Sequence, residues 1–216
     1  MRCLELVPEL RELPIIVRDP LTSFQADVLR ILGVKNKLII TNGESFKIDN
    51  LFFPSIPSPP FLHSGSMKWL RSRMLSNLDG ISGKKRRIYI SRQDSNRRVA
   101  NEAEIIQMLL GLGFEILVLS ALESTDQMRL FRESEIIVLP HGAAGVHLLF
   151  AQLEAKVIEL HSPNWLNSCY LGLCNSLGIS YDAIIGSQID LGLDYFVDPM
   201  RLQFLIEEKI TATNDK

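Results

Sequence analysis

The chain has 216 residues, of which 46% are apolar and 22% are charged, and its formal net charge is −2. These values fit one ordinary globular domain, or one domain with part of another, and they exclude wholesale disorder. The balanced charge gives no reason to expect nucleic acid as a partner.

The N-terminus carries no recognisable signal peptide, and no window of about twenty apolar residues exists. We therefore expect a cytoplasmic protein without a transmembrane segment. The three cysteines, Cys3, Cys169 and Cys174, lack the spacing of metal ligands and are expected to be buried, reduced thiols. We expect neither a metal nor a cofactor.

Residues 1–55 are predicted to form a small α/β segment. A helix around 4–10 is weakened by Pro8, and strands are expected at 14–17 and 38–40. Between them, Thr22 or Ser23 can cap a helix that ends at Gly33. Two strands cannot bury both faces of a sheet, so this segment is expected to be the last part of a partial second α/β domain.

Residues 56–65 are rich in proline and serine and are predicted to be a stiff linker. A helix is expected to follow, from Ser66 to about Leu78. From Arg87 onward, apolar strand signals alternate with helix signals. Strands are predicted at 88–90, 115–119, 135–139 and 156–160. Helices are predicted after a cap at Asn101, after a cap at Ser124 or Thr125, at 143–152, at 164–177 and at 199–209.

This alternation predicts an α/β fold: a Rossmann-like parallel sheet with helices on both faces, over residues 66–196. Residues 197–216 are predicted to be a C-terminal helix and tail. In an open parallel sheet, ligands bind beyond the carboxyl ends of the strands. Two stretches place unusual residues at such ends.

The first stretch follows the strand at 88–90. Ser91 and Arg92 come directly after the strand, and Arg97 and Arg98 stand just before the next helix. Guanidinium forks match phosphate oxygens, and the start of a helix adds amide donors, so this loop suits a diphosphate. The alternative is a solvated basic loop.

The second stretch is His141-Gly142-Ala143, after the strand at 135–139. Small residues let the backbone approach a ligand closely, and His141 can donate a hydrogen bond to a phosphate or sugar oxygen. The dinucleotide fingerprint G-x-G-x-x-G is absent. His141 can equally be a structural turn residue, and His147, inside the following helix, is expected to pack.

Glu159 is an acid within the apolar run at 157–160. A buried carboxylate needs a partner, and the hydroxyls of a ribose diol are one such partner. The alternative is a surface position at the end of the strand.

Taken together, these stretches resemble glycosyltransferase family 61, of the type found in capsular polysaccharide biosynthesis. Any one of the motifs alone would be weak; their order and spacing carry the resemblance. The matching residues are Tyr89-Ile90-Ser91-Arg92, Arg97-Arg98, Asn101-Glu102, Glu104, Gly113-Phe114-Glu115, Gln127, His141-Gly142-Ala143, Leu148-Leu149-Phe150 and Val157-Ile158-Glu159-Leu160.

The resemblance implies the C-terminal domain of a GT-B fold, which binds a nucleoside-diphosphate sugar and transfers the sugar to a glycan or glycoconjugate acceptor. It implies an inverting, metal-independent reaction, and the chain indeed contains no Asp-x-Asp. By position, Arg92 and either Arg97 or Arg98 would hold the diphosphate, with His141, Gly142 and Ala143 beside it. Glu159 would be a possible nucleotide contact.

Two departures from the family pattern stand out. Relatives often have glycine at the position of Ala144 and asparagine at that of His147. They also carry a complete acceptor domain ahead of this region, which usually supplies the general base, and here only its last part is expected. Asp19 and Asp27 are available acids, but nothing distinguishes either as a base. The alternative function is therefore a truncated, non-catalytic module that binds nucleotide or a partner, and a homodimer is possible.

Overall fold

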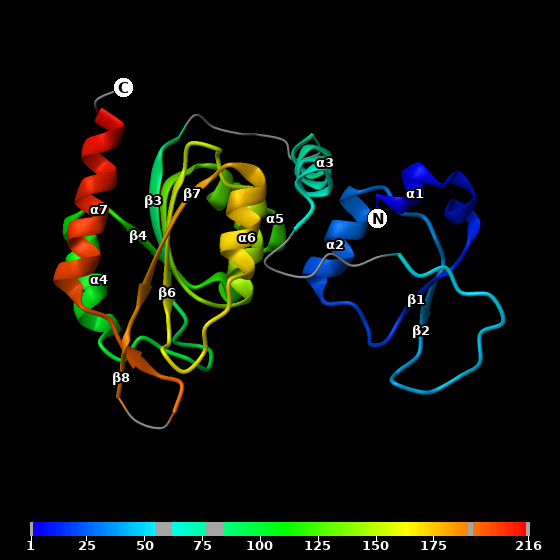
Figure 1. Cartoon of the computed structure of the whole chain (residues 1–216), viewed down its shortest axis with the longest axis horizontal. Coiled ribbons are helices and arrows are strands. Elements are labelled where there is room, and N and C mark those ends of the chain that lie inside the picture. Colours follow the sequence, from blue (N-terminus) through cyan, green and yellow to red (C-terminus); the bar gives the residue numbers. More distant parts are fainter. Residues whose placement is uncertain (1, 55–61, 77–83, 190–191, 215–216) are drawn as a thin grey trace.

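The computed structural model describes residues 2–54, 62–76, 84–189 and 192–214 (Figure 1). Most of the predicted linker at 56–65, and the predicted helix end at Leu78, lie outside these ranges. Among the helices in the described ranges, none combines the length and the apolar character needed to cross a bilayer.

The centre of the molecule is a sheet of five parallel strands in the order β4-β3-β5-β6-β7. This confirms the predicted α/β class with a parallel sheet. The strands are β3 (Arg86–Ile90), β4 (Glu115–Leu117), β5 (Ser134–Pro140), β6 (Lys156–His161) and β7 (Ser180–Ile185). β7 was not predicted, because its sequence, Ser-Tyr-Asp-Ala-Ile-Ile, begins with polar residues that suit an edge strand but break the apolar run.

Helices cover both faces of this sheet (Figure 1). On one face, α4 (Glu102–Gly111) and α7 (Pro199–Asn214) pack over Ile136 and Val138 of β5. On the other face, α3 (Ser64–Leu75), α5 (Ser124–Arg132) and α6 (Cys169–Leu177) pack over Ile137 and Leu139. Successive residues of β5 thus enter opposite cores, which is why a strand buried on both faces reads as a continuous apolar run.

Several element boundaries differ from prediction. The helix expected at 143–152 is a 3-10 helix, η3 (Ala143–Leu149), and Gly145 and Val146 near its start are both weak α-helix formers. The helix expected from residue 164 begins only at Cys169, and the strand expected to reach residue 119 ends at Leu117 before a short turn, η2 (Leu119–Ala121). A small antiparallel pair, β8 (Ser187–Gln188) and β9 (Tyr195–Phe196), was not predicted.

The N-terminal segment has the predicted β-α-β order. β1 (Ile15–Val17) and β2 (Leu38–Ile40) pair in parallel, and α2 (Ser23–Ile31) lies between them in the chain. Thr22 caps α2 in a capping box with Gln25, as the sequence suggested. The helix expected around 4–10 divides at Pro8 into α1 (Cys3–Leu6) and a 3-10 turn, η1 (Pro8–Glu12).

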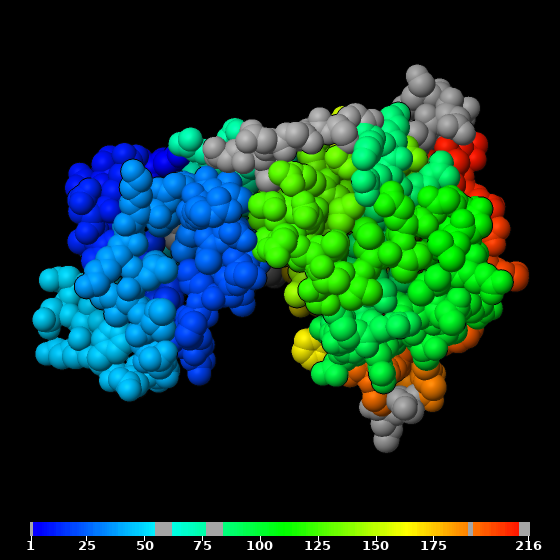
Figure 2. Space-filling model, turned by 180° about the vertical axis from the view of Figure 1, so that it is seen from behind, coloured from blue at the N-terminus to red at the C-terminus, as the bar shows by residue number. Residues whose placement is uncertain are grey.

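Helix α3 joins the N-terminal segment to the sheet domain. Glu5 accepts hydrogen bonds from Trp69 Nε1, at 2.6 Å, and from Arg73, both on α3. On its other side, α3 sends Arg71 to the carbonyl of Leu149, at 2.6 Å. Away from this junction an open notch separates the two parts (Figure 2). The proposed domain division at 55 and 65 stays a prediction.

α2 contributes directly to the sheet domain's core through Phe24, whose ring meets that of His147 edge-on with centroids 4.9 Å apart. His147 also contacts Phe131 and Phe150, and its Nδ1 is buried without a hydrogen-bond partner in the described part of the chain. It therefore packs, as predicted for this position. Burial in this aromatic setting lowers the pKa of His147 from 6.5 to about 4.

This depressed pKa predicts a pH-dependent stability. Because unfolded His147 binds a proton near pH 6.5 and folded His147 does so only near pH 4, the folded state loses stability as the pH falls between these values. We expect His147 to account for a loss of about 2 kcal/mol between pH 7 and pH 4.5. Urea unfolding of wild type and His147→Leu at both pH values checks this: the variant should lose less stability, and an equal loss would contradict the assignment.

Candidate functional site

The strand order reverses direction between β3 and β5, and at the carboxyl edge of a parallel sheet such a reversal is where ligands commonly bind. Tyr89 pairs with Val138, so continuing the parallel register past the strand ends brings Arg92 beside His141. In the same way, Pro140 pairs with Leu160, which brings His141 beside His161. Residues that the sequence placed at two separate strand ends thus meet in one place. The notch of Figure 2 lies next to this edge.

Arg92 lies directly on Gly142. A Cβ atom added to Gly142 would stand 1.2 Å from Arg92 Nη1, so only glycine leaves room for the guanidinium group. Nη2 of Arg92 donates to Ser95 and to the carbonyl of Asn96, whereas its buried Nε has no partner among the described residues. Arg92 therefore presents a half-buried cation with unused donor capacity.

Arg97 is the second cation at this edge. Its backbone has φ 65°, a left-handed conformation that costs energy for a residue with a side chain. Its guanidinium lies over the indole of Trp165, 5.2 Å from the ring centroid, and its Nη1 is buried with no partner found in the described ranges. Burial lowers the pKa of Arg92, and the charge of Arg97 lowers it further, so the two cations are close enough to repel each other.

Arg98 points to a different partner. Its backbone N–H and its guanidinium both bind Asp194, with Nη2 2.8 Å from Oδ2. This ion pair fixes the loop before α4 to the segment before β9. Of the two arginines that the sequence left as alternatives, the structure thus places Arg97 with Arg92, and Arg98 in an ion pair.

Ser91 and Ala143 lie at the same edge, and their predicted contacts with a donor stay predictions. The Ser91 side chain accepts a 3.4 Å hydrogen bond from the Gln93 backbone, within its own turn. Ala143 is exposed at the start of η3. We define the carboxyl-edge cluster as Arg92, Arg97, His141 and Gly142.

His141 is held by Glu159. Its Nδ1 stands 2.6 Å from Glu159 Oε1, and its ring stacks on that of His161 at 5.1 Å. Glu159 is fully buried and also accepts a hydrogen bond from the hydroxyl of Tyr181 on β7. Burial alone would raise the pKa of Glu159, but hydrogen bonds from His141, His161 and Tyr181 outweigh it and lower that pKa to about 2.

Glu159 thus finds inside the protein the partner that a buried carboxylate requires. The alternative of a surface position at the strand end is wrong, because none of its side chain is exposed. Direct contact with a nucleotide stays a prediction.

Sequence reasoning missed several residues around the cluster. The ring of Tyr170, in the first turn of α6, packs on Gly145 and lies 5.4 Å from the ring of His141. Tyr181 escaped notice because β7 was not predicted, and Asp194 because no local pattern links it to Arg98. A polar strand of alternating pattern at 180–185 is the signal that could have revealed Tyr181.

Three residues of the family motifs form hydrogen bonds with other parts of the protein rather than with the carboxyl-edge cluster. Asn101 does not cap α4 through its side chain but pairs with both backbone groups of Val197, at 2.8 and 3.0 Å. Buried Glu102 accepts a 2.8 Å hydrogen bond from the Tyr89 hydroxyl. Gln127 donates to the carbonyls of Leu119 and Leu122, and so holds the turn after β4.

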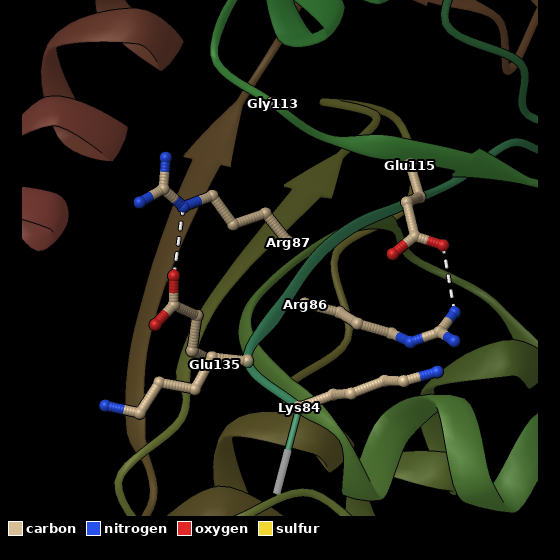
Figure 3. A pocket seen from close by; sticks show the side chains of 7 residues that line it. Lys84, Arg86, Arg87, Gly113, Glu115 and Glu135 are labelled. Atoms are coloured by element: carbon tan, nitrogen blue, oxygen red, sulfur yellow. Dashed lines mark hydrogen bonds and ion pairs between the residues drawn. The ribbon is translucent and has the colours of Figure 1, made fainter. Parts of the chain in front are cut away.

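A second concave region lies at the opposite, amino-terminal edge of β3 (Figure 3). It has a volume of about 480 Å³ and is lined by Lys84, Lys85, Arg86, Arg87, Gly113, Glu115 and Glu135. Arg86 pairs with Glu115 at 2.9 Å and Arg87 with Glu135 at 3.0 Å, so its arginines are already neutralised by carboxylates. This balance makes it a poorer anion site than the carboxyl-edge cluster.

Comparison with known proteins identifies a family for this chain. The family model described as Glycosyltransferase 61 matches residues 3–158. Curated proteins named EGF domain-specific O-linked N-acetylglucosamine transferase are also similar to this chain. The Mus musculus protein is 33% identical over 104 residues, which are 46% of this chain and 20% of the mouse protein. The Drosophila melanogaster protein is 32% identical over 96 residues, 43% of this chain and 18% of the fly protein. The chain thus spans about a fifth of the length of these relatives.

The contact between Arg92 and Gly142 predicts the effect of one added methyl group. We expect Gly142→Ala to displace the Arg92 guanidinium and expose it, while the fold stays intact because the displaced atoms are the end of a flexible side chain. Modification of Arg92 by phenylglyoxal, located by peptide mass spectrometry, should therefore become faster. Gly111→Ala is the matched control, since nothing lies within 4 Å of its added Cβ. Equal labelling of Arg92 in all three proteins would contradict this geometry.

Proposed function

The chain belongs to the glycosyltransferase 61 family, and from this premise we propose that it transfers a sugar from a nucleoside-diphosphate sugar to a hydroxyl of a glycan or glycoconjugate. The donor's diphosphate binds at the carboxyl-edge cluster. The sheet domain acts as the donor-binding half of a GT-B architecture, and the acceptor approaches from the side of the N-terminal segment.

One observation carries this proposal: two arginines from the loop after β3 and a histidine from the end of β5 converge at the switch point of a parallel sheet. Arg92 Nε and Arg97 Nη1 are buried donors that lack a partner among the described residues. Buried donors without partners are costly, and a diphosphate would satisfy them while neutralising the repulsion between the two guanidinium groups. The negative charge of a diphosphate matches the two guanidinium groups of the cluster, and its oxygens match their N–H donors.

The reaction is proposed to be inverting and independent of a metal ion. The acceptor hydroxyl attacks the anomeric carbon as the bond to the diphosphate breaks, and the electron pair of that bond passes to the phosphate oxygen. A general base takes the proton of the hydroxyl as the new bond forms. Arg92, Arg97 and His141 stabilise the charge that develops there. Neither Asp19 nor Asp27 is favoured as general base, because each lies near an arginine of its own segment, Arg18 and Arg30.

The names of the relatives suggest which substrates to test first. Because proteins 31–33% identical in the matched region carry the name of an N-acetylglucosamine transferase, we propose a nucleotide-linked N-acetylglucosamine as the first donor. An EGF domain is by the same reasoning the first acceptor to try, alongside simple oligosaccharides.

A second candidate function is nucleotide binding without turnover, as a module that docks on a partner. Exposed apolar side chains favour it: Leu51, Phe52 and Phe53 are 60%, 66% and 74% exposed, and Ile39 and Ile40 of β2 are also accessible. A surface of this kind marks an interaction site. The partner would be a second copy of the chain or an acceptor-side domain.

Binding of nucleotides tests the proposed site. Titration calorimetry of UDP and GDP should give a measurable affinity for wild type, and Arg92→Ala and Arg97→Ala should each weaken it by about tenfold to a hundredfold, since each removes charged hydrogen bonds to phosphate. Arg129→Ala is the matched control, because Arg129 pairs with Asp126 within α5, away from the carboxyl-edge cluster. Binding that is absent in wild type, or equal in all variants, would overturn the proposal.

The metal-independent mechanism makes a separate prediction. Sugar transfer, followed by release of UDP or GDP, should keep its rate when the protein is treated with excess EDTA, because the cations at the leaving group are side chains. Addition of Mg²⁺ or Mn²⁺ should likewise change the rate of transfer by no more than about twofold. Loss of transfer on chelation, reversed by a divalent metal, would show that the reaction needs an ion. Nucleotide binding without transfer to any acceptor would favour the second candidate function.

A further inference from the structure

A group of polar side chains, all buried except the half-buried Tyr181, lies beneath α6, behind the carboxyl-edge cluster. It consists of His141 at the end of β5, Glu159 and His161 on β6, and Tyr181 on β7; we call it the buried polar network. Glu159 Oε1 is 2.6 Å from His141 Nδ1, and the Tyr181 hydroxyl donates to Oε2. His161 Nε2 lies 3.4 Å from Oε2 and 3.3 Å from the Tyr181 hydroxyl.

The register of the sheet explains why these residues meet. Glu159 and His161 are two apart on β6 and therefore point to the same face, the one covered by α6. On β5, Leu139 is the direct neighbour of Glu159, so His141, two residues later, is a diagonal neighbour of Glu159. On β7, Ala183 is the direct neighbour of Glu159, so Tyr181, two residues earlier, is a diagonal neighbour on that side.

Glu159 is poorly placed to touch a ligand itself. None of its side chain is exposed, and each carboxylate oxygen already accepts a hydrogen bond from the protein. A free carboxylate would also repel a diphosphate. Whatever Glu159 contributes to the site must therefore pass through His141, the one member of the network that adjoins Gly142 and Arg92.

The network settles the orientation of His141. With Nδ1–H donated to Glu159 and the ring held between His161 and Tyr170, the imidazole has little freedom to turn. Its other nitrogen, Nε2, has no partner among the described residues, and 8% of the residue stays exposed. A histidine held in this way keeps one nitrogen available at the surface of the site.

A metal ion is the competing occupant, since His141, Glu159 and His161 bring ligand atoms within 4.8 Å of one another. The spacing argues against it. Two ligands of one tetrahedral zinc ion stand about 3.3 Å apart, whereas His141 Nδ1 and Glu159 Oε1 are 2.6 Å apart. That distance is typical of a charge-assisted hydrogen bond, so a proton fits between these atoms better than a metal ion.

We propose that Glu159 is a positioning residue that aims His141 Nε2–H at the leaving diphosphate. The inference rests on the proposed function and deepens it. When the sugar–phosphate bond breaks, its electron pair moves to the phosphate oxygen, and His141 donates a hydrogen bond to that oxygen without giving up its proton. To donate from both nitrogens His141 must carry a hydrogen on each, and the Glu159 carboxylate accepts the one on Nδ1.

Glu159→Gln tests the role, because glutamine keeps the shape and an acceptor oxygen but removes the negative charge. We expect kcat to fall about tenfold or more, with the KM for donor changed less than about threefold, since the charge matters most in the transition state. The other titratable groups facing His141 are Arg92, Tyr170, His161 and Tyr181, and none of them is altered.

A double-mutant comparison separates positioning from direct contact. In a His141→Asn background, Glu159→Gln should cost nothing further in kcat. Equal losses in both backgrounds, or a loss confined to donor KM, would overturn the proposal. Glu102→Gln is the matched control: it also neutralises a buried glutamate bonded to a tyrosine, but one without a histidine partner. Its effect on kcat should be the same in the wild-type and His141→Asn backgrounds.

Two further measurements keep the inference separable from the proposed function. Nitrogen-15 NMR of the histidine rings should show Nδ1 of His141 protonated in the free protein and perturbed in Glu159→Gln, with no activity required. If Glu159→Gln does not fold, Tyr181→Phe should shift the same signals by a smaller amount. Elemental analysis that finds stoichiometric zinc would overturn the proposal. Transfer by wild type that is unchanged in Glu159→Gln would refute this inference alone, whereas wild type that binds no nucleotide would refute the proposed function.

Discussion

Parallel pairing of β3 with β5 is the constraint on which the rest of the site depends. The first strand of the domain lies between the second and the third, so the chain leaves the sheet in opposite directions on either side of this pair. The two loops that follow these strands therefore face each other at the carboxyl edge. The register then places Arg92 next to His141. Neither residue is near the other in sequence, and neither is held by a local turn alone; their adjacency is a property of the sheet.

The sequence allowed the edge residues to be predicted, but not their partners. Arg92, His141 and Glu159 could be singled out because each is a polar residue at, or within, an apolar run, and the ends of parallel strands meet at one edge. The choice between Arg97 and Arg98 could not be made, because it depends on Asp194, 96 residues after Arg98. The edge strand β7 was hidden by its polar start, and with it the hydroxyl that completes the surroundings of Glu159.

The same limit applies to the family motifs. Asn101 and Glu102 belong to the matching stretches, yet one pairs with the backbone of Val197 and the other with Tyr89. Both contacts join the start of α4 to neighbouring elements, so they hold the loop that carries Arg97 in place. A motif therefore mixes residues that face the ligand with residues that keep the loop in position. Only burial and hydrogen-bond partners separate the two kinds, and neither is visible in a single sequence.

The electrostatics of the carboxyl-edge cluster, like its position, support the proposed binding of a diphosphate. Two guanidinium groups close enough to depress the pKa of Arg92 repel each other, and Arg97 adds a backbone conformation that is costly without glycine. Arg98, one residue away, instead forms an ion pair with Asp194. An anion that binds between two cations relieves their repulsion, which supports the proposed diphosphate site. The fully buried Glu159 is bonded to His141 rather than to the arginines, so its negative charge does not occupy the place that we propose for a phosphate.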